Sequence, residues 1–267
     1  ELSLEEVRTI RQKTSKELEI ETFGHGAMCV SYSGRCLLSN YMTGRDSNRG
    51  ACAQPCRYQY ALMEEKRPGE YFPVYEDEKG TYILNSRDMC TIDHLKDLMD
   101  AGIDCIKIEG RAKSFYYVAV VTNAYRQALD LYWKDPENFV LPAWIEEETR
   151  KVSHRQYSTG FYFGKPTENT QIYDNNTYVN EYIYLGIVEE AAPNGLVRIE
   201  QRNKFSVGDS IEIMRPSGEN TVVTVEAMFD AEFSPVESCP HSKQLIYLKL
   251  STVPEQYDLL RVHNVKN

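Results

Sequence analysis

Residues 91–111, TIDHLKDLMDAGIDCIKIEGR, form the stretch that decides the expected fold. The first eleven of them place apolar side chains at helical spacing, and Gly102 follows as a typical C-terminal cap. A strand pattern comes next over residues 103–109, and residues 114–133 then carry apolar side chains at the spacing of a long helix. Together with the strand pattern that precedes it, the stretch gives the order strand, helix, strand, helix, which predicts a parallel sheet or a piece of a barrel.

The rest of the N-terminal half adds fewer regular elements. A capping-box pattern opens a helix over residues 4–14, and strict alternation predicts a strand over residues 17–23. Residues 71–74 and 81–84 predict two paired strands around a turn-forming acidic segment. A further helix is expected over residues 145–153.

The C-terminal part has a different pattern. Beyond residue 178, six short alternating segments are separated by turn signals such as PNG and PSG. Short strands at this spacing predict a small antiparallel barrel or a sandwich. We therefore expect the chain to divide into an α/β part, residues 1–165, and an all-β part, residues 166–267.

Composition limits the class of protein. The 267 residues include 30 basic and 40 acidic side chains, a net charge of −10, so no global positive field attracts nucleic acid. No apolar run approaches the roughly 20 residues that cross a bilayer, and the N-terminus shows no secretory signal. Seven cysteines outside a secretory context indicate thiols, metal ligands or a cluster, as in a cytoplasmic protein. The chain lacks an initiator Met and opens in a helix pattern, so we expect that an upstream part is missing.

Five of the cysteines could share one inorganic centre. Residues 24–70 show no sustained period, and a stretch of this length without periodicity is usually functional. Four thiolates can hold a zinc ion or an iron–sulfur cluster. The spacing differs from the paired C-x2-C knuckles of structural zinc and suits a cluster better, while unrelated free or buried thiols remain the alternative. The cysteines concerned are Cys29, Cys36, Cys52, Cys56 and Cys90.

Six segments carry a family resemblance. They are ETFGHGAMC (21–29), SGRCLLS (33–39), RGACAQPCR (49–57), NSRDMC (85–90), KIEGR (107–111) and YSTGF (157–161). In this order they resemble the peptidase U32 (collagenase-like) family. The resemblance implies a TIM-like barrel, of which this chain holds only the later βα units because a full barrel takes roughly 250 residues. The C-terminal strands resemble the family's appended β-barrel, so the expected fold class is α/β plus all-β: a partial TIM-type (β/α) barrel followed by a small antiparallel β-barrel.

The resemblance also implies a function, an iron–sulfur enzyme of the tRNA wobble-uridine 5-hydroxylation type. Prephenate would be its co-substrate, and tRNA and a second U32-family subunit its partners, with no membrane involved. The 4Fe–4S ligands would be Cys29, Cys36, Cys52 and Cys90, with Cys56 as the alternative to Cys52 and zinc as the alternative to the cluster. Two other functions stay open: a collagenase-like peptidase that hydrolyses peptide bonds, and a non-enzymatic scaffold subunit with a structural metal.

Strand parity predicts which side chains would point into the barrel. Over residues 103–109 the apolar parity would pack under helices, which leaves Cys105, Lys107 and Glu109 inward. A charge inside a barrel is costly unless it is paired, so we expect Lys107 to pair with a carboxylate. Cys105 and Cys239 match no ligand position and are expected to be packing residues.

Candidate site residues follow from these placements. The candidate catalytic residues are His25, Glu109 and Arg111, which would line a pocket beside the cluster at the C-terminal rim of the barrel. An arginine-bearing loop could hold an anionic substrate or an RNA phosphate. Each role has a structural alternative. His25 could be a structural histidine, and Glu109 and Arg111 could belong to an ion network that supports the fold. The loop arginines could pair with carboxylates at the barrel rim. The candidate substrate-binding residues are Arg35, Arg57 and Lys107.

Peptidase chemistry has little support from motifs. The sequence contains no H-E-x-x-H and no G-x-S-x-G, so a zincin-type or serine-type peptidase is not indicated. A cysteine peptidase needs a cysteine paired in space with a histidine, and Cys29 with His25 stays open as such a pair.

Overall fold

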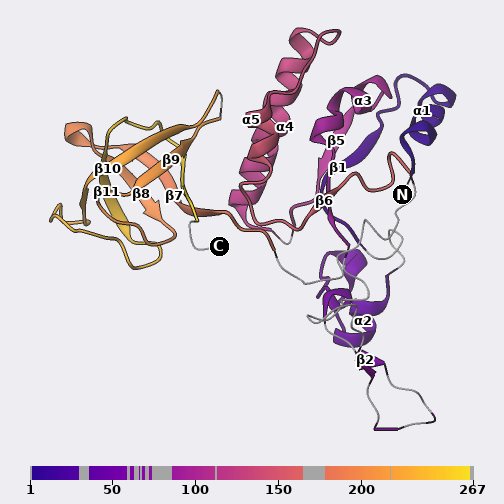
Figure 1. Ribbon diagram of the computed structural model, residues 1–267, viewed down its shortest axis with the longest axis horizontal. Helices are drawn as coiled ribbons and strands as arrows, with labels where there is room; N and C mark the ends of the chain where they lie inside the picture. Colours follow the sequence, from indigo (N-terminus) through magenta and orange to yellow (C-terminus); the bar gives the residue numbers. More distant parts are fainter. Residues whose placement is uncertain are drawn as a thin grey trace. The chain divides into compact units, whose positions relative to one another are not determined.

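The structure is a computed structural model that describes residues 2–29, 36–58, 61–62, 66, 68–69, 72–73, 86–111, 113–164, 178–216 and 218–264. Its contacts divide the chain into two compact units. The α/β unit comprises residues 1–121, 128–141 and 154–179, and the barrel unit comprises residues 122–127, 142–153 and 180–267. Figure 1 labels many of their helices and strands.

A four-stranded sheet in the order β5-β1-β4-β6 forms the centre of the α/β unit. Its strands are β1 (Glu21–Ala27), β4 (Asp88–Cys90), β5 (Cys105–Ile108) and β6 (Tyr157–Ser158). β1 pairs in parallel with β5, as the βα pattern predicts, and β4 pairs in parallel with β6. β1 and β4 are antiparallel, with His25 opposite Cys90, so the sheet is mixed.

The predicted helices of the α/β unit are confirmed. α1 begins at the expected capping box, in which the Glu6 carboxylate accepts a hydrogen bond from the Ser3 N–H at 2.8 Å. α3 follows a short 3-10 turn and is terminated by Gly102, whose φ of +79° is one that glycine adopts readily. The confirmed helices are α1 (Leu4–Lys13), α3 (Leu95–Asp100) and α4 (Phe115–Lys134), and α2 (Leu38–Thr43) is a further helix that the sequence did not predict. α4 contributes residues to both units.

One strand prediction needs correction. The strand expected over residues 17–23 is wrong in position, because β1 begins only at Glu21. The chain first turns where the Leu18 N–H donates to the Ser15 carbonyl at 3.1 Å, which leaves Leu18 exposed.

A strand is also expected over residues 71–74. It is present as β3 (Phe72–Pro73), but its described partner is β2 (Ala61–Leu62). The expected partner, residues 81–84, lies outside the described residues.

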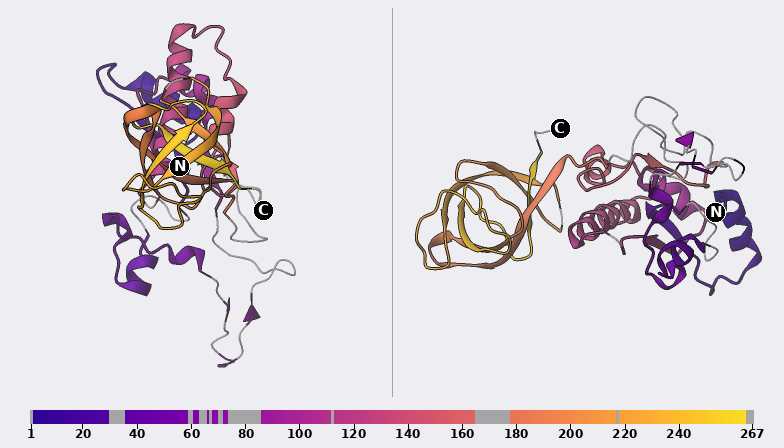
Figure 2. Two further views of the ribbon diagram at one scale, coloured as in Figure 1. Left: turned by 90° about the vertical axis from the view of Figure 1, so that its left-hand side faces the viewer. Right: turned by 90° about the horizontal axis from the view of Figure 1, so that it is seen from below.

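The barrel unit contains a closed six-stranded barrel, as the sequence predicts. The strands follow one another around it in the order β10-β11-β8-β7-β12-β9, and every pair is antiparallel. Figure 2 shows this ring of strands in its right-hand view. The strands are β7 (Tyr182–Ala191), β8 (Val197–Gln201), β9 (Ser210–Met214), β10 (Thr221–Phe229), β11 (Leu245–Leu250) and β12 (Leu259–His263).

Alternation along the strands fills the barrel interior with apolar side chains. Along β8 the inward positions include Val197 and Ile199, and Leu185 of β7 and Ile246 of β11 belong to the same buried core. Gly186 permits close approach of β7 and β8, because a Cβ atom there would lie 2.5 Å from the Glu200 carbonyl oxygen.

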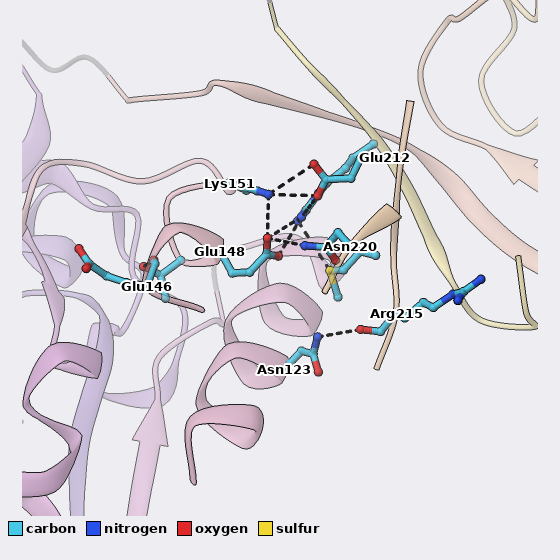
Figure 3. Close-up of polar contacts among 10 residues, drawn as sticks. Asn123, Glu146, Glu148, Lys151, Glu212, Arg215 and Asn220 are labelled. Atoms are coloured by element: carbon cyan, nitrogen blue, oxygen red, sulfur yellow. Dashed lines mark hydrogen bonds and ion pairs between the residues drawn. The ribbon is translucent and has the colours of Figure 1, made fainter. Parts of the chain in front are cut away.

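Helix α5 (Ala143–Glu148) also belongs to the barrel unit. The sequence predicts this helix over residues 145–153. In the structure it begins two residues before the predicted start and ends five residues before the predicted end. A buried ion network, the barrel network, joins α5 and the turn after it to the strands (Figure 3). Its members are Glu148, Lys151, Glu212, Asn220 and Arg261.

Every charge in the barrel network has a partner of opposite sign. The guanidinium of Arg261, which is fully buried, donates to both Glu148 oxygens at 2.8 Å and also to Glu212. Lys151 Nζ lies 2.9 Å from Glu148 and 3.1 Å from Glu212. Burial alone would raise the pKa of Glu212, but Arg261 and Lys151 hold that pKa below its usual value.

No helix within the described parts of the chain is both long enough and apolar enough to cross a membrane.

Candidate functional site

A group of buried and partly buried polar side chains lies where β1, β4 and β6 adjoin the start of α4. We call it the polar cluster. Buried polar groups are costly unless they are paired, so such a concentration in one unit calls for an explanation. Its members are His25, Asp88, Lys113, Tyr117, His154, Arg155, Tyr157 and Tyr178.

Asp88 is the anionic centre of the polar cluster. Its carboxylate accepts from the Arg155 backbone N–H at 3.1 Å and from two nitrogens of the Arg155 guanidinium at 3.1 and 2.8 Å. Lys113 Nζ lies 3.6 Å from the same carboxylate. Burial would raise the pKa of Asp88, but the two cations outweigh burial and lower it. The carboxyl group of Asp88 is therefore ionised at neutral pH.

Aromatic rings hold Lys113 in place beside Asp88. Its ammonium lies 5.0 Å from the ring centroid of Tyr117 and 4.9 Å from that of Tyr178. Cations at such distances over an aromatic face are attracted by its quadrupole, and more strongly where water is excluded. Lys113 is thus fixed by a carboxylate and two rings.

His25 is the buried histidine of β1, and it is surrounded by aromatic rings. Tyr157 contacts it edge-on, with the hydroxyl 3.4 Å from His25 Nε2, and Tyr117 lies on another side at 6.0 Å between ring centroids. His154 stacks on Tyr157 at 4.3 Å. Burial lowers the pKa of His25 to about 3, so its imidazole is neutral at physiological pH. Such a ring can accept or donate a hydrogen bond, but it supplies no imidazolium proton.

The neutral state of His25 predicts acid sensitivity. The unfolded chain binds a proton at this residue below about pH 6.5, whereas the native state binds it only near pH 3, so stability is lost as the pH falls. Through His25 alone the free energy of unfolding should decrease by about 2 kcal/mol between pH 7 and pH 5. Denaturant unfolding of the wild type and of His25→Gln at both pH values checks this. Equal losses in the two proteins would contradict it.

Tyr117 is almost completely buried in the first turn of α4. Burial, followed by the nearby carboxylates of Asp88 and Glu109, raises the pKa of Tyr117 far above its usual value, so the phenol stays protonated. Among the described residues its hydroxyl has no hydrogen-bond partner. A buried polar group left in this state costs about 1–3 kcal/mol, which makes it an unusual feature of a native structure.

The predicted catalytic residues lie beside the polar cluster. The Glu109 N–H donates to the His25 carbonyl oxygen at 2.8 Å, and a Cβ atom on Gly26 would lie 2.6 Å from the Glu109 Cβ, so β1 and the end of β5 are in close contact. The Glu109 carboxylate accepts from the Arg111 N–H at 3.0 Å. The exposed Arg111 guanidinium packs against Gly50, in the segment that carries Cys52 and Cys56. The structure therefore brings His25, Glu109 and Arg111 into one region.

The structure does not gather the predicted cluster ligands. Among the residues that it describes, no three His, Cys, Asp or Glu side chains are placed so that they could hold a metal ion. Cys90 lies opposite His25, and Cys29, two residues past β1, is exposed. Within the part of the chain that the structure describes, the cysteines therefore show no ligand set for a 4Fe–4S cluster or for zinc. The assignment to Cys29, Cys36, Cys52 and Cys90, with Cys56 as the alternative, stays a prediction.

The two remaining cysteines differ from each other. Cys239 is fully buried in the barrel core, which confirms the packing role expected for it. The same expectation is wrong for Cys105, which is exposed, with its thiol 3.6 Å from the Glu21 carboxylate. Lys107, on the same face of β5 as Cys105, is half exposed as well.

Of the three predicted substrate-binding residues, the structure describes the side chain of Lys107 alone. Lys107 forms the expected pair with a carboxylate, Glu21, at 3.1 Å, and its ammonium lies 5.2 Å from the Phe23 ring, but the pair is half exposed. Arg35 lies outside the described residues. Arg57 ends a short 3-10 turn, and its side chain is not among those described. A substrate-binding role for the three stays a prediction.

Sequence reasoning missed most of the polar cluster, although a signal was present. Asp88 and Tyr157 lie in the segments NSRDMC and YSTGF, and both segments contribute strands to the sheet. A charged residue within a short strand that also carries apolar side chains is a sign of a buried pair. The partners of Asp88 are distant in sequence, so the pairing itself could not be read from the chain.

Comparisons with known proteins agree with this architecture. Residues 1–172 match the family model of Peptidase family U32, and residues 180–261 match that of the Peptidase family U32 C-terminal domain. The chain is 38% identical over 251 residues to tRNA hydroxylation protein P1 of Bacillus subtilis (strain 168), covering 94% of this chain and 59% of the relative. It is 35% identical over 301 residues to tRNA hydroxylation protein P of Escherichia coli (strain K12), covering 97% of this chain and 64% of the relative.

A third relative has a different name. The chain is 30% identical over 239 residues to a collagenase of Porphyromonas gingivalis (strain ATCC BAA-308 / W83), covering 85% of this chain and 56% of the relative. The chain spans about three fifths of the length of these curated relatives.

Proposed function

The chain belongs to peptidase family U32, and from that premise we propose that it acts in the hydroxylation of tRNA, at the wobble uridine. The observation that carries the proposal is the similarity to proteins named for tRNA hydroxylation, which extends over 94% and 97% of this chain. It therefore includes both the polar cluster and the barrel unit. The activity proposed is that of the whole protein, and the chain covers 59% and 64% of the length of these two relatives.

The polar cluster supports a role in binding and orienting a substrate. His25 is neutral and buried beside Tyr157, and Asp88 is a fixed carboxylate held by Arg155 and Lys113. Groups held this firmly are pre-organised, so they lose little entropy when a ligand binds. In this proposal Glu109 and Arg111, which adjoin His25, contact the ligand from the end of β5.

The finer features are also proposals. They comprise a 4Fe–4S cluster on Cys29, Cys36, Cys52 and Cys90, prephenate as co-substrate, a second U32-family subunit as partner, and a location in the cytoplasm with the tRNA. Iron and sulfide analysis of the full-length protein, purified without air, tests the cluster. Stoichiometric zinc without iron would favour a structural metal instead.

A peptidase is the second candidate function, because the collagenase relative is 30% identical to this chain. In a cysteine peptidase the histidine must carry a proton while it pairs with a thiolate. Burial lowers the pKa of His25 to about 3, which makes that charged state costly. The described environment of His25 therefore disfavours the Cys29–His25 pair as a catalytic dyad.

Deletion of the gene tests the proposed function. We expect tRNA from the deletion strain to lose 5-hydroxyuridine, and the full-length gene supplied on a plasmid to restore it. Mass spectrometry of nucleosides from digested tRNA measures the change, and an unrelated modified nucleoside in the same digest serves as the control. An unaltered content of 5-hydroxyuridine, in a strain without a second U32 gene of the same type, would exclude this function.

A further inference from the structure

The side chain of Tyr117 has a hydroxyl group that the fold itself does not use. The residue is fixed at its backbone, because its N–H donates to the Ser114 hydroxyl at the N-cap of α4 at 3.2 Å. Its ring is fixed as well, by the Lys113 ammonium on its face and by the neighbouring ring of His25. Only the hydroxyl hydrogen is left to rotate.

This hydroxyl is a donor in a place where donors are normally paired. It is buried, and among the described residues no atom accepts its hydrogen bond. Other buried tyrosines of the same unit differ from it, since the Tyr162 hydroxyl donates to the Phe23 carbonyl oxygen at 2.6 Å. Native structures rarely leave such a group unsatisfied unless a water, an ion or a ligand completes it.

The surroundings of the hydroxyl select the kind of acceptor. Burial, followed by the nearby carboxylates of Asp88 and Glu109, raises the pKa of Tyr117, so the hydroxyl keeps its proton and acts as a donor. The charge of Asp88 is already compensated by Arg155 and Lys113. A neutral oxygen acceptor, such as a carbonyl group, adds no charge to this environment.

We propose that Tyr117 Oη donates a hydrogen bond to a carbonyl oxygen of the ligand that binds beside His25 and Glu109, which makes Tyr117 a substrate-binding residue. The inference rests on the proposed function for the identity of that ligand. Carbonyl oxygens are present both on a uracil base and on an organic acid co-substrate. We favour the base, because it is neutral.

Tyr117→Phe tests the proposal, since phenylalanine keeps the ring and its packing and removes only the hydroxyl. Without ligand, we expect the melting temperature of the full-length variant to rise by about 2 °C or more, because a desolvated donor has been removed. In cells that lack the chromosomal gene and express the variant at the wild-type protein level, we expect the 5-hydroxyuridine content of tRNA to fall at least tenfold.

The matched control is Tyr162→Phe, which removes a hydroxyl that has a partner. This variant should melt at a lower temperature and keep its 5-hydroxyuridine content in proportion to the amount of protein. With purified full-length protein, an increase in KM for tRNA assigns the carbonyl to the base. An increase confined to KM for the organic acid assigns it to the co-substrate.

Two results would overturn the proposal. One is a Tyr117→Phe variant that melts lower than the wild type, which would mean that the hydroxyl has a structural partner such as a buried water. The other is an unchanged 5-hydroxyuridine content. If the wild-type gene itself restores no 5-hydroxyuridine, the proposed function fails, and the thermal comparison still decides whether Tyr117 carries an unused donor.

Discussion

Replacing Arg261 by alanine should lower the free energy of unfolding of the barrel unit by about 3–5 kcal/mol, because the change leaves two buried carboxylates without their shared cation. Arg261 donates to Glu148 on α5 and to Glu212 on β9, and it is fully buried. Lys151 would remain beside the glutamates, but one ammonium cannot compensate two carboxylates.

Fluorescence of Trp144 reports this loss, because Trp144 lies on α5 within the barrel unit. The other tryptophan, Trp133, is 65% exposed and can be replaced by phenylalanine in the background used for the measurement. Arg198→Ala is the matched control. Arg198 pairs with Glu189 and Glu190 on the barrel surface, and its side chain is 32% exposed. This control should cost at most about 1 kcal/mol, so equal losses in the two variants would show that the barrel network does not act as a buried unit.

Asp88→Ala is the second change for which we expect a large effect. It should lower the free energy of unfolding of the α/β unit by about 3–5 kcal/mol, because it leaves the guanidinium of Arg155 and the ammonium of Lys113 buried without a counter-charge. Since the pKa of Asp88 is lowered on folding, its contribution is present above about pH 4 and is lost as the pH falls further.

Denaturant unfolding followed by Trp133, in a Trp144→Phe background, measures the effect of Asp88→Ala. Glu21→Ala in the same sheet is the control, because the Glu21–Lys107 pair is half exposed. We expect a loss below about 1 kcal/mol for that control. A small loss for Asp88→Ala as well would mean that the buried cations find other partners.

Much of the fold could be predicted because it depends on local periodicity. The helices α1, α3 and α4 and the six barrel strands each have the apolar spacing that their burial requires, and caps at Ser3 and Gly102 mark two of the helix ends. β1 was misplaced because residues 17–20 alternate like a strand, although the chain turns there and leaves Leu18 exposed.

The polar cluster could not be predicted in the same way. Its charges come from β4, from the segment before β6 and from the residue before the α4 cap, and only the register of a mixed sheet brings them together. α5 presents a similar difficulty. Its sequence, AWIEEE, resembles an exposed helix end, yet Glu148 is buried against Arg261 of the barrel. A partner more than a hundred residues away decides that burial.

The content of 5-hydroxyuridine in tRNA, measured in a deletion strain that expresses the full-length wild type or His25→Gln at equal level, tests most directly whether the polar cluster serves tRNA hydroxylation. We predict that the wild type restores the nucleoside and that His25→Gln, with a folded protein confirmed by its melting curve, leaves at most about a tenth of it. Full restoration by His25→Gln would show that the polar cluster only supports the fold, and no restoration by the wild type would contradict the function itself.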